Sequence, residues 1–337
     1  GEFAGATVLV TGAGGSIGME ICRQLLKFGV GRIVALGRGE HSIYTLAKTL
    51  GEYLALMDNP PDVAYRIADV RHERSLECAF ERFRPGIVFH AAAHKHVPLM
   101  EFNEAEALAN NVGGTRNALE LSAAFGARRF VLVSTDKAVR PANVMGATKR
   151  LAELVTGYYG RERGLSTAIV RFGNVIGSRG SVIPLFREQI ERGGPVTVTH
   201  PEVTRYFMSI PEAALLVINA SAYSRGGEIF VLDMGRPYRL ADVARRLIGL
   251  YGYEPDRDIR IEYTGLRPGE KLYEELFYDE QSLARTGNEK IMVLGSDSRA
   301  LTSGEYRALM EEFLPESRAM DRRAIREKIR AFVPEYE

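Results

Sequence analysis

Short runs of β-branched and aliphatic residues alternate with helical patterns along the first half of this chain, and this alternation restricts its fold more than any other feature. Six such runs predict strands at residues 7–10, 32–36, 63–67, 87–90, 129–133 and 166–171. Largely apolar runs are typical of strands that helices cover on both faces. The pattern therefore predicts an α/β fold with a doubly wound parallel sheet, in which ligands bind at the carboxyl ends of the strands.

A glycine-rich loop lies between the first predicted strand and the helical stretch that follows it. Gly12, Gly15 and Gly18 have a spacing in which one glycine allows a tight turn, one lets the backbone approach a pyrophosphate, and one lets the helix pack closely. A glycine motif alone is a weak signal, and its alternative is a simple tight turn. Because a strand precedes it and a helix follows it, we interpret the loop, including Ser16 and Ile17, as the site of a nicotinamide dinucleotide.

The residues after the second and third predicted strands bear on the choice of cofactor. Folds that bind NAD usually carry a carboxylate at the end of the second strand, but Arg38 stands there in this chain. A guanidinium suits a 2′-phosphate, so the sequence favours NADP, while the nearby Glu40 leaves NAD open. Asp69 and Val70 follow the third strand, where they could contact the adenine of the cofactor. The alternative is that they only form a turn, and the sequence does not favour either.

The chain of 337 residues is long enough for two lobes. Glycine and proline interrupt the regular rhythm after about residue 175. We therefore predict a dinucleotide-binding Rossmann domain over residues 4–174. Residues 175–337 are expected to form mainly a smaller mixed α/β lobe for the substrate, with some segments returning to the first domain.

Charge and cysteine content exclude several classes of function. The chain has 44 Lys and Arg against 43 Asp and Glu, so no global field favours nucleic acid or an anionic membrane surface. Cys22 and Cys78 both occur in helical patterns and are expected to be buried and reduced, as in a cytoplasmic protein. No apolar run approaches the roughly 18 residues of a membrane span. The opening Gly1-Glu2-Phe3 resembles a remnant of cloning, so a longer native protein is expected.

The stretch after the fifth predicted strand carries the candidate chemistry. It contains Thr135-Asp136-Lys137, followed on the next helix by Met145 and Lys149, which a spacing of four places on one face. This arrangement resembles the extended short-chain dehydrogenase family, which has Ser or Thr at this strand end and Tyr-x-x-x-Lys on the helix. Met145 replaces that tyrosine and cannot transfer a proton. Either the chain is inactive or Asp136 and Lys137 act as acid and base.

Longer motifs are similar to bacterial UDP-N-acetylglucosamine 4,6-dehydratases. They are His90 to Pro98, Asn111 to Thr115, Arg171 to Ser178, Thr204 to Phe207 and Leu266 to Lys271. Thr-Asp-Lys with Met in the tyrosine position resembles the long, membrane-anchored polysaccharide-biosynthesis branch of that family. The resemblance implies a UDP-sugar substrate, a homo-oligomer, and a native protein held at the cytoplasmic face of the inner membrane by a segment that this fragment lacks.

The resemblance also implies roles for individual residues. Asn174 corresponds to a substrate-binding asparagine, and Arg205 and Arg267 to arginines that hold the nucleotide diphosphate, a task that suits guanidinium groups. Glu270 is expected to accept hydrogen bonds from ribose or to orient an arginine. The further expected contacts are Ala91, Ala92 and Lys149 with the cofactor, and His96 and Ser178 with the substrate.

These residues suggest a redox-neutral dehydration that gives a 4-keto-6-deoxy sugar. A neutral Lys137 would remove the C5 proton, a protonated Asp136 would assist departure of the C6 hydroxyl, and Asp136, relayed through Thr135, would take the C4 hydroxyl proton. The cofactor would be tightly bound and recycled. The alternatives are a sugar-nucleotide 4-epimerase or reductase and a non-catalytic dinucleotide-binding regulator. His90, His94 and His96 lack a completing cysteine or carboxylate, so no metal site is expected.

Overall fold

A nine-stranded sheet forms the centre of the protein in a computed structural model that describes residues 2–277, 283–295 and 299–337. Its order is β14-β15-β11-β6-β5-β4-β1-β2-β3, and the seven strands from β11 to β3 are parallel. The strands of this sheet are β1 Thr7–Thr11, β2 Arg32–Gly37, β3 Asp62–Ile67, β4 Ile87–His90, β5 Arg129–Val133, β6 Ser166–Arg171, β11 Glu228–Leu232, β14 Leu283–Arg285 and β15 Ile291–Leu294. All six strands expected from the sequence are confirmed.

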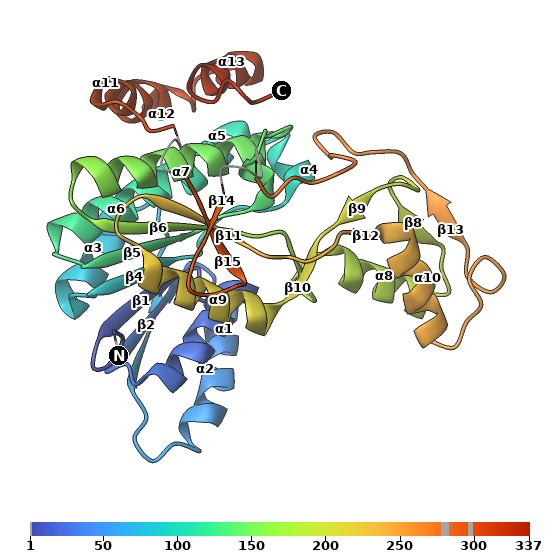
Figure 1. Ribbon diagram of the computed structural model, residues 1–337, viewed down its shortest axis with the longest axis horizontal. Coiled ribbons are helices and arrows are strands. Elements are labelled where there is room, and N and C mark those ends of the chain that lie inside the picture. The colour runs from blue at the N-terminus through green and yellow to red at the C-terminus, as the bar shows by residue number, and fades with distance from the viewer. Residues whose placement is uncertain (1, 278–282, 296–298) are drawn as a thin grey trace.

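Helices cover both faces of the sheet, as the apolar strands require (Figure 1). One face carries α1 Ser16–Leu25, α2 Glu40–Leu54 and α9 Ile210–Tyr223; the other carries α3 Glu73–Phe83, α4 Val97–Met100, α5 Glu104–Leu108, α6 Gly114–Ala124 and α7 Val144–Glu162. Two apolar cores fill the space between the layers. This doubly wound Rossmann architecture confirms the predicted fold class.

The sheet order places a ligand crevice beside β1. The chain runs outward from β1 to β2 and β3, then crosses back to place β4 on the other side of β1. The connections therefore diverge at the carboxyl ends of β1 and β4, which is where open parallel sheets bind ligands.

A smaller lobe projects from the carboxyl edge of the sheet, on the right of Figure 1. Its elements are β7 Asn174–Ile176, α8 Val182–Glu191, β8 Val196–Val198, β9 Thr204–Arg205, β10 Phe207–Ser209, β12 Tyr238–Arg239, α10 Leu240–Leu250 and β13 Ile261–Tyr263. Three two-stranded sheets and a separate apolar cluster that includes Phe186, Val196 and Ile248 hold it together. Between these elements the chain returns to the main sheet through β11, and it returns again through β14 and β15.

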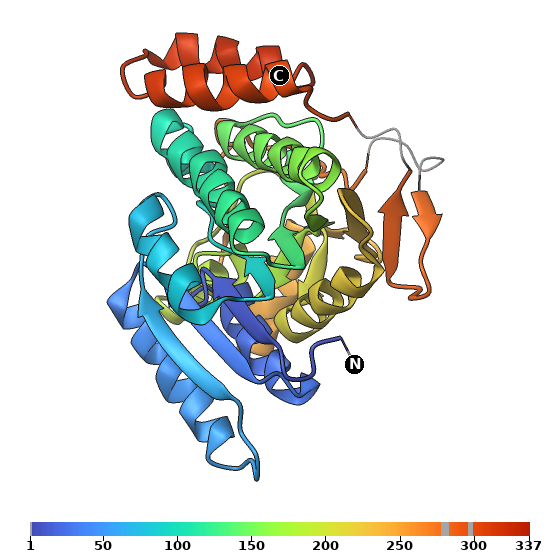
Figure 2. The same ribbon diagram turned by 90° about the vertical axis from the view of Figure 1, so that its left-hand side faces the viewer.

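The last described segment packs across the helices on one face of the main sheet (Figure 2). It comprises α11 Ser303–Arg307, the π-helical η5 Ala308–Phe313, α12 Leu314–Glu316 and α13 Arg322–Phe332. Its apolar side chains join the core around α7, and Arg326 pairs with Glu101 and Glu104 at 2.9 Å. The segment is therefore tied down by both apolar packing and ion pairs.

The two cysteines differ in their surroundings. Cys22 is buried and free, as expected, but Cys78 is exposed, so the prediction that both are buried is wrong for Cys78. The reason is the helical period of α3, which turns Leu76, Ala79 and Phe80 inward and leaves residue 78 on the solvent side.

Candidate active site

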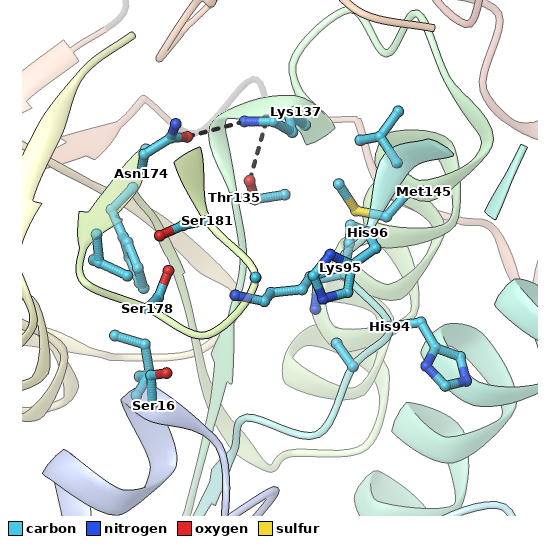
Figure 3. Close-up of a pocket in the computed structure, with 18 of the residues that line it drawn as sticks. Ser16, His94, Lys95, His96, Thr135, Lys137, Met145, Asn174, Ser178 and Ser181 are labelled. Carbon is cyan, nitrogen blue, oxygen red and sulfur yellow. Dashed lines mark hydrogen bonds between the residues drawn. The ribbon is translucent and has the colours of Figure 1, made fainter. Parts of the chain in front are cut away.

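A cavity of about 600 Å³ lies between the carboxyl edge of the main sheet and the smaller lobe. It extends from the glycine loop to Arg205 and Arg267 and brings together most of the residues singled out in the sequence. The expected residues that line it are Gly15, Ser16, Ile17, Gly18, Ala91, His96, Thr135, Lys137, Met145, Lys149, Asn174, Ser178, Arg205, Arg267 and Glu270. Figure 3 shows how several of these side chains converge on the cavity.

The glycine loop has the geometry that a dinucleotide requires. Gly12 has φ +65°, and a Cβ there would lie 2.6 Å from the backbone nitrogen of Ala92. A Cβ on Gly18 would lie 2.3 Å from the carbonyl oxygen of Gly12, so this glycine allows the close contact between helix and loop. The loop leads into α1, whose N-cap Gly15 offers no side-chain cap to the first helical N–H groups. Those N–H groups and the helix dipole suit a pyrophosphate.

Five of the expected cofactor residues do not line the described cavity: Gly12, Arg38, Asp69, Val70 and Ala92. Arg38 is exposed between β2 and α2. Asp69 pairs with Arg71 at 2.6 Å, and the hydrogen bond from this guanidinium is the main reason why the pKa of Asp69 falls to about 2. Val70 is buried against Gly114, where a Cβ would lie 2.6 Å from its side chain. Arg38, Asp69 and Val70 follow β2 and β3, whereas Ala92 follows β4 and lies against Gly12.

The Thr135-Asp136-Lys137 segment follows β5 and forms the short 3₁₀ helix η3 Asp136–Ala138. The Thr135 hydroxyl faces the cavity and donates to Asp136 Oδ1 at 2.9 Å. Asp136 itself is 1% exposed and does not line the cavity, and its Oδ2 lies buried against Gly173 without a hydrogen-bond partner. Asp136 therefore reaches the cavity through its neighbours and not directly.

Lys137 connects the two carboxylates of the site. Its Nζ lies 3.0 Å from Asp136 Oδ1, 3.3 Å from Glu274 Oε1 and 3.4 Å from Asn174 Oδ1 (Figure 3). Burial by itself lowers the pKa of Lys137, but the negative charges of Asp136 and Glu274 outweigh it and raise the pKa overall. These ion pairs favour the charged form of Lys137, so the neutral lysine of the expected mechanism must first lose its proton.

The expected substrate arginines differ in how firmly they are held. Arg205 is 6% exposed and donates to Glu270 Oε1 at 3.1 Å, while its Nε lies 3.6 Å from Glu274. Arg267 is exposed and lines the cavity; its backbone N–H donates to Glu270 Oε2 at 3.2 Å, and its carbonyl oxygen accepts from the N–H of Glu270 at 3.0 Å. Of the two roles expected for Glu270, orientation of an arginine is the one that these contacts show.

Met145 and Lys149 occupy the first two turns of α7 and share one face, as the spacing of four predicts. Both are buried and both line the cavity. The Nζ of Lys149 donates to the carbonyl oxygen of Val133 at 2.9 Å. Burial lowers the pKa of Lys149 to about 8, although Glu153 opposes this shift. Met145 presents a thioether, which can neither give nor take a proton, so it contributes shape but no proton.

The three neighbouring histidines have separate partners. His90 is buried below the glycine loop, between the hydroxyls of Thr11 at 2.8 Å and Thr115 at 3.2 Å. His94 contacts Glu106 at 2.9 Å, and His96 lines the cavity. Within the described residues, no group of three or more His, Cys, Asp or Glu side chains could hold a metal ion.

Three charged cavity residues were not among those expected from the sequence: Lys95, Arg179 and Glu274. Lys95 lies inside the His90 to Pro98 motif and Arg179 directly follows the Arg171 to Ser178 motif, but only their neighbours were expected to bind ligands. Glu274 follows the Leu266 to Lys271 motif by three residues and carries no local signal that separates it from the adjacent Glu275. Burial separates them, because the side chain of Glu274 is 4% exposed and that of Glu275 is 36% exposed.

Comparison with known proteins identifies the family. Residues 8–296 match the model of a family described as "Polysaccharide biosynthesis protein". The chain belongs to this family. It is 53% identical over 291 residues to "Capsular polysaccharide biosynthesis protein CapD" of Staphylococcus aureus. The matched region covers 86% of this chain and 48% of that protein. It is 33% identical over 307 residues to "UDP-glucose 4-epimerase" of Rickettsia canadensis, which covers 90% of this chain and 87% of that protein.

Solved structures share this fold. The X-ray structure of Pen from Bacillus thuringiensis has a TM-score of 0.79 and 32% identity, with 89% of this chain and 90% of that chain covered. A dTDP-glucose 4,6-dehydratase from Streptomyces venezuelae, solved with NAD and DAU bound, superposes with a TM-score of 0.70 at 23% identity. The match covers 80% of this chain and 88% of that chain, and it shows a shared fold. The chain spans about half the length of the first curated relatives that it matches. None of its described helices is both long and apolar enough to cross a membrane.

Proposed function

We propose that this protein is a UDP-N-acetylglucosamine 4,6-dehydratase that forms a UDP-4-keto-6-deoxy sugar for surface polysaccharide biosynthesis. The observation that carries the proposal is the position of Lys137 between two buried carboxylates on the wall of a cavity that also contains the glycine loop and two arginines. A nearby acid and base are what elimination of water requires beyond oxidation and reduction.

The cavity suits both ligands of such a reaction. The glycine loop and the N-terminus of α1 fit a nicotinamide dinucleotide, and Arg38 after β2 favours NADP. Arg205 and Arg267, at the other end, supply donors for the diphosphate of a UDP-sugar. The bound cofactor would accept a hydride from C4 of the sugar and return it to C6, so it would remain resident and would not be consumed.

The residues of the chain itself account for the proton transfers. Lys137 Nζ and Asp136 Oδ1 are 3.0 Å apart, and they become a base and an acid once Lys137 has lost its proton to solvent and Asp136 has taken the C4 hydroxyl proton through Thr135. The amine removes the C5 proton once C4 is a ketone. The acid protonates the leaving C6 hydroxyl through Thr135, whose hydroxyl both lines the cavity and contacts Asp136. The Lys137 ammonium formed in this step then returns a proton to C5, which balances the hydride that returns to C6.

Incubation with UDP-N-acetylglucosamine in deuterated solvent tests the proposal. A dehydratase gives a product lighter by one water, with solvent deuterium at C5 and no 6-hydroxyl. Asp136→Asn and Lys137→Ala should each abolish product while the cofactor stays bound, whereas Lys290→Ala, at an exposed lysine that pairs with Glu212, should not. Wild-type turnover in either site variant would refute the assignment.

A second candidate is a 4-epimerase, which the similarity to the Rickettsia protein supports. An epimerase would return the hydride to C4, retain the 6-hydroxyl and leave C5 free of deuterium. Met145 supports a third candidate, a non-catalytic dinucleotide-binding regulator, for which the sugar would emerge unchanged. The same incubation therefore separates all three.

A further inference from the structure

A short strap, residues 177–181, connects β7 to α8 and crosses from the smaller lobe to the glycine loop. The backbone N–H of Arg179 donates to Ser16 Oγ at 3.3 Å, and its guanidinium donates to the carbonyl oxygen of Gly14. The flanking Gly177 and Gly180 have φ of +76° and +68°. Arg179 is thus the residue through which the smaller lobe contacts the glycine loop.

The course of the strap is tightly constrained. A Cβ on Gly180 would lie 2.4 Å from His96 Cε1, so the strap packs directly on that ring. Ser178 is 4% exposed and also lines the cavity. The hydroxyl of Ser181 faces the cavity wall and is buried without a hydrogen-bond partner. These contacts hold the backbone of Arg179 over the loop.

Two positive charges meet at this point. Lys95 and Arg179 both line the cavity and are close enough for the charge of Arg179 to act on Lys95. Among the ion pairs of the described residues, none joins a carboxylate to either cation. Burial, followed by repulsion from Arg179, lowers the pKa of Lys95. Two cations on the wall of one cavity, with Arg179 in contact with the loop that leads into the uncapped N-terminus of α1, form an environment that an anion would stabilise.

We propose that Arg179 and Lys95 bind the pyrophosphate of the dinucleotide, and that the strap thereby closes over the cofactor and retains it. This inference rests on the proposed function and adds the residues that make the cofactor resident. A UDP-sugar carries a diphosphate of the same chemistry. The contacts of Arg179 with Gly14 and Ser16 favour the dinucleotide, because Arg205 and Arg267 supply the cations at the opposite end of the cavity.

Nucleotide binding by Arg179→Gln and Lys95→Gln tests the inference without any turnover. The release rate of bound dinucleotide is measured on the protein as purified, and the Kd for NADP⁺, NAD⁺ and UDP by calorimetry. A lost charge-assisted hydrogen bond corresponds to a Kd about 10- to 100-fold higher. We expect such a loss for the dinucleotides and little change for UDP. Arg187→Gln, at an exposed arginine of α8 that contacts Tyr251, is the matched control and should bind like the wild type.

The outcomes separate the inference from the proposed function. Unchanged dinucleotide affinity and release in both Arg179→Gln and Lys95→Gln, or a larger loss for UDP than for NADP⁺, would overturn the inference. A wild-type protein that binds no dinucleotide would instead refute the proposed function. Circular dichroism and the Tm of each variant show whether it is folded, and Arg179→Lys, which retains the charge but not the planar fork, should fall between wild type and Arg179→Gln.

Discussion

Removal of the Glu274 carboxylate should change the protonation of Lys137 and, through it, the pH at which the enzyme works. Glu274 Oε1 lies 3.3 Å from Lys137 Nζ, and both side chains are largely shielded from water. An opposite charge at this distance typically shifts a pKa by about 1–3 units. Since Glu274 is one of the two charges that raise the pKa of Lys137, Glu274→Gln should lower that pKa by a similar amount.

The sign of the effect on activity follows from the role assigned to Lys137. If the neutral amine removes the C5 proton, kcat increases with pH as Lys137 loses its proton. A lower pKa moves this increase by about 1–3 pH units toward lower pH. Only kcat is informative, because Glu274 also contacts Arg205 and its removal will affect substrate binding.

The matched control is the neighbouring residue. Glu275→Gln removes a carboxylate that pairs with Arg140 at 2.7 Å and Lys271 at 3.4 Å, with no ion pair to Lys137, so its profile should coincide with that of the wild type. The pH dependence of acylation of Lys137, followed by peptide mass spectrometry, measures the same pKa without any substrate. A kcat profile that stays in place or moves to higher pH in Glu274→Gln would refute the reasoning.

Three further changes should affect binding or stability. Gly12→Ala should greatly reduce the dinucleotide retained after gel filtration, because its Cβ would lie 2.6 Å from the backbone of Ala92 at a φ of +65°. Glu153→Gln should lower the free energy of unfolding in urea by about 3–5 kcal/mol, because it leaves the fully buried Arg171 guanidinium without its carboxylate partner; a loss below about 1 kcal/mol would contradict this. Burial, aided by the charge of Lys149, lowers the pKa of His90 to about 3, which is below its value in the unfolded chain. The unfolded chain therefore binds the proton first as the pH falls. The free energy of unfolding should decrease between about pH 6.5 and pH 3, by up to about 1.4 kcal/mol per pH unit. His90→Asn should flatten that slope in urea titrations at several pH values, and an identical slope would contradict the assignment.

The sequence by itself determined the first six strands of the main sheet, the glycine loop and the absence of a tyrosine at residue 145. These features are local: an apolar run specifies a covered strand, the spacing of Gly12 and Gly18 specifies a close turn into a helix, and Met145 has no proton to give. Even the shared face of Met145 and Lys149 follows from the period of one helix.

Only the tertiary structure decided how the charges of the site pair. Lys137 and Glu274 are 137 positions apart, and they meet because the smaller lobe folds back over the end of β5. The same packing turned Asp136 inward, brought Arg179 onto the glycine loop, and buried Glu274 but not Glu275. Coulombic interactions and desolvation depend on distance and burial, which local sequence patterns do not encode, so the charge state of Lys137 could be derived only from the folded chain.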